Sequence, residues 1–198
     1  MWKFVEEQNG KVVPNTNQGA GLICDAFVGV VQQPPPGRMT VLAVVEETKS
    51  RFGRQPRESV LRATRFTKED AAAAGAFAAA QVAAIYEQVG SDDRLWAAID
   101  AARSGKDDAL RAAIDPVALA ASEAREAGVD AAALAAEAAR AAILAGMARE
   151  AGTALQATGY AVAYAIQSAR CINADWPVTM AIEKWLMSRA AELKKVRS

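Results

Sequence analysis

The chain has 198 residues, with 23 basic and 23 acidic side chains, no histidine and two cysteines. This composition excludes collagen, disulfide-rich scaffolds and chains that are disordered because of high net charge. Alanine is the most informative residue: there are 48, and 45 of them lie from Ala63 onward. An alanine methyl buries much less apolar area than a leucine or phenylalanine. The composition therefore indicates a core built from many closely approaching helices.

Prolines divide the chain near residue 66. Five of the seven lie in the first 56 residues, and only Pro116 falls between residues 67 and 172. We therefore predict a proline-rich N-terminal extension or small subdomain at 1–66, followed by an alanine-rich helical bundle at 67–198. Within the extension, the apolar run 21–31 fits a helix or a strand. The spacing in 41–52 favours an amphipathic helix, with a strand as the alternative because of its β-branched residues.

Capping residues and glycines mark the helices of the bundle. Thr67 with Asp70 resembles a capping box, and Asp115 followed by Pro116 is typical of an N-cap with proline at the first helical position. The predicted helices cover 68–89, 92–104, 107–114, 116–127, 130–150 and 153–170, with a last helix after Pro177 whose final turn is basic (Lys194, Lys195, Arg197). Short connections make antiparallel neighbours the default. The predicted class is all-α: an alanine-rich antiparallel multi-helix bundle with a loop-rich N-terminal extension, for which a mixed structure stays open.

Few side chains in this sequence suit catalysis. The absence of histidine removes Ser-His and Cys-His nucleophile activation. We expect Cys24 and Cys171 to be buried small hydrophobic residues. The paired acids Glu69/Asp70, Asp92/Asp93 and Asp107/Asp108 stand where helices begin, as the helix dipole favours. We predict no catalytic, cofactor-binding or metal-binding residue and no enzymatic activity; a helical enzyme that uses carboxylates only is a third-ranked alternative.

Charge is strongly segregated along the chain. Residues 49–68 carry seven basic and one acidic side chain, whereas 69–150 carry seven basic and fourteen acidic ones. The basic segment could contact nucleic-acid phosphates, with Phe52 and Phe66 as stacking partners. It could also be a linker docked on the acidic bundle, or bind an acidic partner. Its candidate contact residues are Arg51, Arg54, Arg57, Arg62, Arg65 and Lys68.

A series of short motifs runs from residue 76 to the C-terminus. Tyr86-Glu87 is followed by Asp92-Asp93, by Ala98-Ile99-Asp100-Ala101-Ala102-Arg103, by the alanine-rich segment 120–169, and by Trp185 with Leu193. This order resembles the helical immunity protein family of bacterial polymorphic-toxin systems, over residues 74–198. The resemblance implies a non-enzymatic module that neutralises a partner protein by direct binding.

Under this interpretation the partner-binding surface is the acidic face of 87–137 with the edge around Trp96. Its predicted residues are Glu87, Asp92, Asp93, Trp96, Asp100, Asp107 and Asp108. The alternative is a self-assembling structural protein, such as a phage coat or filament subunit, which contacts nucleic acid through 49–68. No signal peptide is apparent, and the uncharged stretch 151–169 is too polar for a membrane span. We expect a cytoplasmic protein, or a virion component under the alternative, with no cofactor and no membrane partner.

Overall fold

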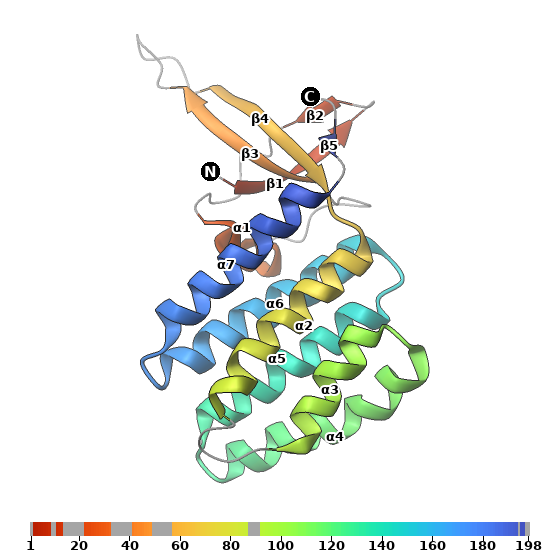
Figure 1. The fold of residues 1–198 in the computed structure, drawn as a ribbon, viewed down its shortest axis with the longest axis vertical. Coiled ribbons are helices and arrows are strands. Elements are labelled where there is room, and N and C mark those ends of the chain that lie inside the picture. Colours follow the sequence, from red (N-terminus) through yellow and green to blue (C-terminus); the bar gives the residue numbers. More distant parts are fainter. Residues whose placement is uncertain are drawn as a thin grey trace.

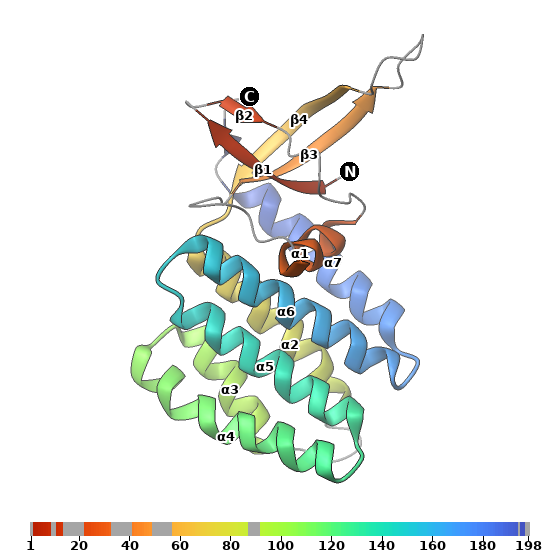
Figure 2. The ribbon, with the colours of Figure 1, turned by 180° about the vertical axis from the view of Figure 1, so that it is seen from behind.

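The computed structural model describes residues 2–8, 11–13, 22–32, 41–48, 57–86, 92–193 and 195–196. A five-stranded sheet lies at one end, and the helices extend away from it to α3 and α4 at the other end (Figure 1, Figure 2). The strands are β1 (Trp2–Gln8), β2 (Lys11–Val13), β3 (Val41–Thr48), β4 (Arg57–Arg65) and β5 (Lys195–Val196). The helices are α1 (Ile23–Gln32), α2 (Lys68–Tyr86), α3 (Asp93–Ser104), α4 (Asp107–Glu126), α5 (Asp130–Met147), α6 (Ala151–Arg170) and α7 (Asp175–Glu192).

The bundle expected from the sequence is confirmed, and the N-terminal extension has a mixed structure. The strands pair antiparallel in the order β2-β1-β3-β4-β5. The amphipathic helix favoured for 41–52 is wrong, because 41–48 forms β3, which pairs with β4 from Val41↔Arg65 to Thr48↔Arg57. This pairing is long-range, so local spacing could not reveal it. The ambiguous run 21–31 resolves into α1.

Alanine allows the central helices to pack closely. Nine of the ten buried residues that α5 contributes are alanines, the tenth being Ile143. A Cβ at Gly75 of α2 would lie 3.4 Å from Ala142 Cα of α5. Side-chain hydroxyl groups of α6 also form hydrogen bonds to neighbouring helices. Thr158 Oγ1 donates to the carbonyl oxygen of Ala71 of α2 at 2.6 Å, and Ser168 Oγ donates to that of Ala131 of α5 at 2.7 Å. The close approach expected from the composition is present.

One predicted boundary is wrong, because 107–126 is a single helix, α4, with Pro116 in its interior. Asp115 is therefore not an N-cap. The buried residues of α4 follow one helical stripe on both sides of the proline: Leu110, Ala113, Val117, Ala120 and Ala121. Pro116 itself is exposed, so the backbone carbonyl that loses its partner can face water. The burial of this stripe against α5 therefore outweighs the tendency of Asp115-Pro116 to end one helix and begin another.

Helix ends elsewhere differ from prediction by a few residues. α2 ends at Tyr86 rather than 89, and α5 ends at Met147 rather than 150, with the break at 148–150. α7 ends at Glu192, and Lys195 lies in β5, paired with Thr64 of β4, rather than in a basic last turn. Lys194 and Arg197 lie outside the described residues. The capping box at Thr67 is confirmed: Asp70 Oδ2 accepts from Thr67 N at 3.0 Å, and Thr67 Oγ1 accepts from Asp70 N at 3.2 Å.

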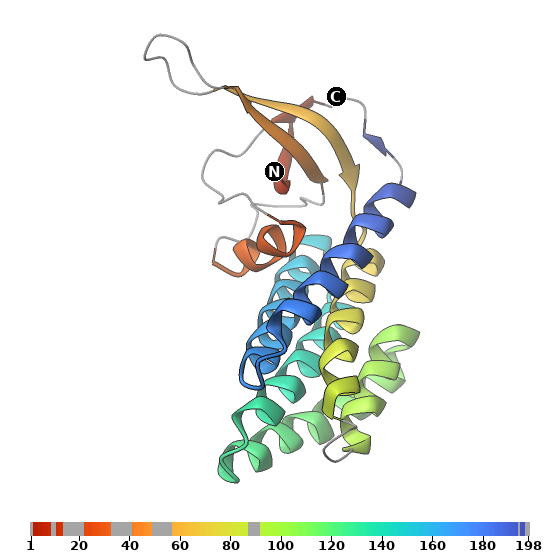
Figure 3. The same cartoon turned by 60° about the vertical axis from the view of Figure 1, so that its left-hand side comes forward.

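α1 joins the sheet to the bundle. Phe27 of α1 packs edge-to-face on Phe4 of β1 and on Phe66, with ring centroids 5.0 and 5.8 Å apart. The other side of α1 packs on α6 and α7 (Figure 3). Glu183 of α7 accepts the backbone N–H groups of Ile23 and Cys24 at 2.9 and 3.0 Å. The extension and the bundle therefore share one hydrophobic core.

The two cysteines have opposite environments, so the expectation that both are buried is wrong for Cys171. Cys24 is buried and Cys171, just after α6, is exposed. Burial, and next the carboxylate of Glu183, raise the pKa of the Cys24 thiol. The thiolate is the reactive form. We expect one equivalent of iodoacetamide to label the folded chain, at Cys171, and two to label it in urea. Peptide mass spectrometry checks this, and native labelling at Cys24 would contradict the packing of α1.

Candidate functional site

The predicted partner-binding residues gather on α3 and α4, at the end of the bundle farthest from the sheet (Figure 1). Asp92 is the N-cap of α3, and its Oδ1 accepts the backbone N–H of Arg94 at 2.9 Å. Gly105 closes the helix with a φ of 63°, a conformation that glycine adopts without strain. The chain then reverses through Lys106, so α4 runs antiparallel to α3.

Arg94 joins the two helices. Its guanidinium donates to Asp92 Oδ2 at 2.8 Å and to Glu123 Oε2 on α4 at 2.7 Å. The hydrogen bond from Arg94 lowers the pKa of the Asp92 carboxyl, so this carboxylate stays charged at neutral pH. Asp92 is therefore used by the chain itself, as the N-cap of α3 and as one of the two carboxylates bound by Arg94.

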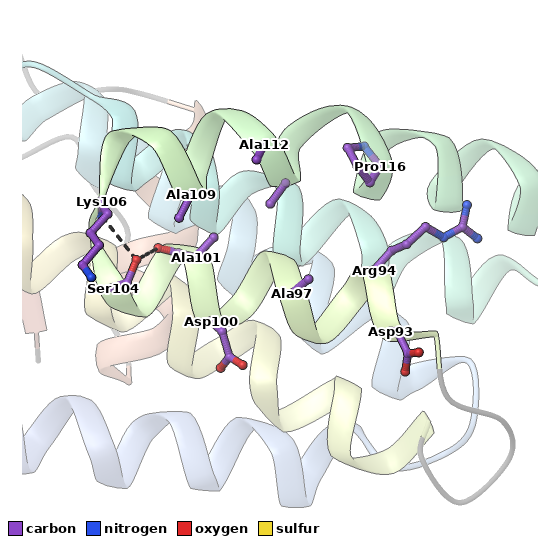
Figure 4. Close-up of a pocket in the computed structure, with 11 residues that line it drawn as sticks. Asp93, Arg94, Ala97, Asp100, Ala101, Ser104, Lys106, Ala109, Ala112 and Pro116 are labelled. Atoms are coloured by element: carbon purple, nitrogen blue, oxygen red, sulfur yellow. Dashed lines mark hydrogen bonds between the residues drawn. The ribbon is translucent and has the colours of Figure 1, made fainter.

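Between α3 and α4 lies a groove of about 630 Å³, which we call the α3–α4 groove. Figure 4 shows its floor of alanines, with Arg94 and Lys106 near its two ends. Asp93 and Asp100 lie on the side of α3 turned away from α4. Because alanine side chains are short, the backbones of both helices lie close to the surface. Such a groove can accept a side chain or a helix of a partner protein that carries basic groups next to the inserted element.

The other predicted residues of this surface fall into three groups. Asp107 and Asp108 are exposed in the first turn of α4, and none of the described basic side chains forms an ion pair with them or with Asp93. Trp96 is half-buried and packs against the core, so only part of it is available to a partner. Glu87 lies outside the described residues.

The basic segment lies far from this surface. Arg57, Arg62 and Arg65 belong to β4 in the sheet, at the opposite end from α3 and α4 (Figure 2). A basic linker docked on the acidic helices is therefore wrong for 57–65, which form a strand. Lys68 is the first residue of α2, and its exposed Nζ lies 3.9 Å from Glu69 Oε1. Arg51 and Arg54 lie outside the described residues.

Sequence reasoning missed an exposed apolar stripe on α7. Trp176, Met180 and Met187 are 67%, 40% and 50% exposed, while Val178, Ile182, Leu186 and Ala190 face the core. The signal was present: apolar residues occupy more of the circumference of α7 than one buried face needs.

Searches against family models, curated proteins and solved structures found no match to this chain. Within the described residues, no group of three or more Cys, Asp or Glu side chains could hold a metal ion. None of the helices that the structure describes is long and apolar enough to cross a membrane.

Proposed function

We propose that this chain is a non-enzymatic protein-binding module of the immunity type, which neutralises a partner protein by covering it with the α3–α4 surface. The observation that supports this most directly is the set of exposed carboxylates on these helices without a basic partner among the described residues: Asp93, Asp107 and Asp108. Residues 92–137 as a whole carry ten acidic and five basic side chains.

Unpaired charge at a protein surface is available for an incoming partner. Acidic side chains around an interface attract a basic surface and raise the association rate, an effect that weakens as salt increases. The alanine floor of the α3–α4 groove offers close backbone approach on the same two helices. α3 and α4 pack on each other and on α5, so little ordering is required on binding. The partner is a protein with a basic functional surface.

The test is co-expression with the product of the neighbouring gene, followed by titration calorimetry of the complex. Asp93→Asn, Asp107→Asn and Asp108→Asn combined should weaken binding about 10-fold, since each exposed charge contributes up to about 1 kcal/mol. Combined Glu69→Gln, Glu150→Gln and Glu192→Gln remove the same charge from exposed positions elsewhere and should leave the affinity unchanged. The absence of a complex and of protection would overturn the proposal.

The α7 stripe supports a second candidate function, self-assembly as a coat or filament subunit. Tryptophan and methionine are enriched at protein interfaces, and Trp176 is 67% exposed. Light scattering should then show a mass that rises with concentration. A strict monomer at high concentration removes this candidate and leaves the partner-binding proposal untouched.

A further inference from the structure

A second groove, of about 480 Å³, lies between α5 and α6. It is built from different residues than the α3–α4 groove, and nothing in the proposed function uses it. Its walls are formed by Glu137, Arg140 and Leu144 of α5 and by Thr153, Gln156, Tyr160 and Tyr164 of α6, above a floor of two alanines. Its volume falls in the range of small-molecule sites. We call it the α5–α6 groove.

One part of the α5–α6 groove is apolar and aromatic. Tyr160 and Tyr164 are one helical turn apart, and their rings stack with centroids 6.0 Å apart and an interplanar angle of 24°. Leu144, on the facing helix, is 42% exposed, and Tyr160 is 38% exposed. Partly exposed aromatic and aliphatic side chains in one groove favour a flat aromatic group.

The other part is cationic and only partly satisfied. The Arg140 guanidinium donates to Glu137 Oε2, over a long 3.4 Å, and its buried Nε–H has no acceptor. Glu137 is shared with Arg125, whose Nη2 lies 3.4 Å from Oε1. Two guanidinium groups therefore share one carboxylate, so Glu137 does not neutralise Arg140 alone; Glu137 and Arg140 line the groove and Arg125 lies outside it. Because a guanidinium has five N–H donors, Arg140 has capacity for an added anion.

We propose that the α5–α6 groove binds a small aromatic carboxylate, with the ring against Tyr160 and Leu144 and the carboxylate on Arg140. The placement follows from charge complementarity at Arg140 and from the tyrosine pair in the same groove. A carboxylate matches the planar fork of a guanidinium better than a spherical anion does. Gln156 and Thr153 supply neutral polar groups on α6, on the N-terminal side of Tyr160.

The probe for this site is indole-3-acetate, titrated into the full-length ¹⁵N-labelled chain and followed by amide chemical shifts. A ligand of this size should bind with a Kd of about 1 mM. Shifts should concentrate in α5 and α6. Indole-3-ethanol keeps the ring and lacks the charge, and acetate keeps the charge and lacks the ring; each should bind about 10-fold more weakly or not at all.

Two variants and one control locate the site. Arg140→Gln should weaken indole-3-acetate binding about 10-fold, and Tyr160→Leu about 5-fold. Arg103→Gln removes an exposed arginine with a comparable i,i+3 acidic neighbour on α3 and should leave the Kd unchanged. Amide spectra of each free variant verify that it is folded, and Tyr160 is exposed enough for its replacement to be tolerated.

Several results would overturn the assignment. These are no saturable binding up to about 10 mM indole-3-acetate, equal binding of indole-3-ethanol, an unchanged Kd for Arg140→Gln, or shifts confined to helices other than α5 and α6. A peptide ending in tryptophan that binds about 10-fold tighter than indole-3-acetate would assign the groove to a partner chain instead. None of these outcomes bears on the α3–α4 surface, so the two proposals succeed or fail separately.

Discussion

Replacing Glu183 by leucine is expected to lower the free energy of unfolding by about 2–4 kcal/mol. Glu183 is 4% exposed, and its two oxygens accept the N–H groups of Ile23 and Cys24 at the start of α1. The first N–H groups of a helix have no acceptor within it, and the carboxylate also lies at the positive end of the helix dipole. Leucine would leave both donors buried and unpaired.

Glu183→Gln is the matched comparison, because its amide keeps one acceptor oxygen and nearly the same volume. We expect a loss about half as large, since one of the two N–H groups stays paired. Urea denaturation followed by circular dichroism measures both variants. The reactivity of Cys24 towards iodoacetamide gives a local measurement, because the thiol should become accessible in Glu183→Leu if α1 detaches. A denaturation midpoint equal to that of the unchanged chain would show that α1 is held by apolar contacts alone.

This contact also shows what the sequence alone could not predict. Residues 23 and 183 are 160 positions apart, and nothing in their local context pairs a buried carboxylate with the start of a short helix. Helices α2, α3, α5, α6 and α7 were recognisable because their signals are local: the capping box at Thr67, the αL glycine at Gly105 and the alanine content all act within a few residues. Helix α4 was divided in two at Asp115-Pro116. The strand β3 was misassigned because its stabilising partner, β4, begins nine residues further along the chain.

The candidate site could also be predicted from the sequence only in part. Acidic pairs at helix starts placed Asp93, Asp107 and Asp108 on one end of the bundle, because α3 and α4 are adjacent in sequence and in space. The hydrogen bond from Arg94 to Glu123 could not be predicted without the packing of α3 on α4. The α5–α6 groove was not predicted, since Arg140 and Tyr160 come together only when those helices align.

Gly159→Ala is expected to destabilise the chain by about 2–3 kcal/mol, and Gly159→Leu by more. The alanine content predicted close helix contacts in general, and the structure shows that at Gly159 the neighbour is α1. A Cβ at 159 would overlap the carbonyl oxygen of Phe27 and lie 2.9 Å from Val31 Cγ2. A backbone atom cannot yield as a flexible side chain can, so α1 must shift and loosen Phe27 from Phe4.

Gly29→Ala on α1 is the control for the Gly159 series. A Cβ there meets nothing within 4 Å, and alanine has the higher helix propensity, so this variant should be stabilised by up to about 1 kcal/mol. Thermal unfolding of Gly159→Ala and Gly29→Ala should therefore move the Tm in opposite directions. Equal Tm values would mean that α1 can shift away from α6 without loss, and the dependence of α1 on a glycine at 159 would be wrong. If Gly159→Ala and Glu183→Leu both lower the free energy of unfolding, both ends of α1 belong to the shared core. The reason is that the two residues contact α1 from different helices, Gly159 from α6 and Glu183 from α7.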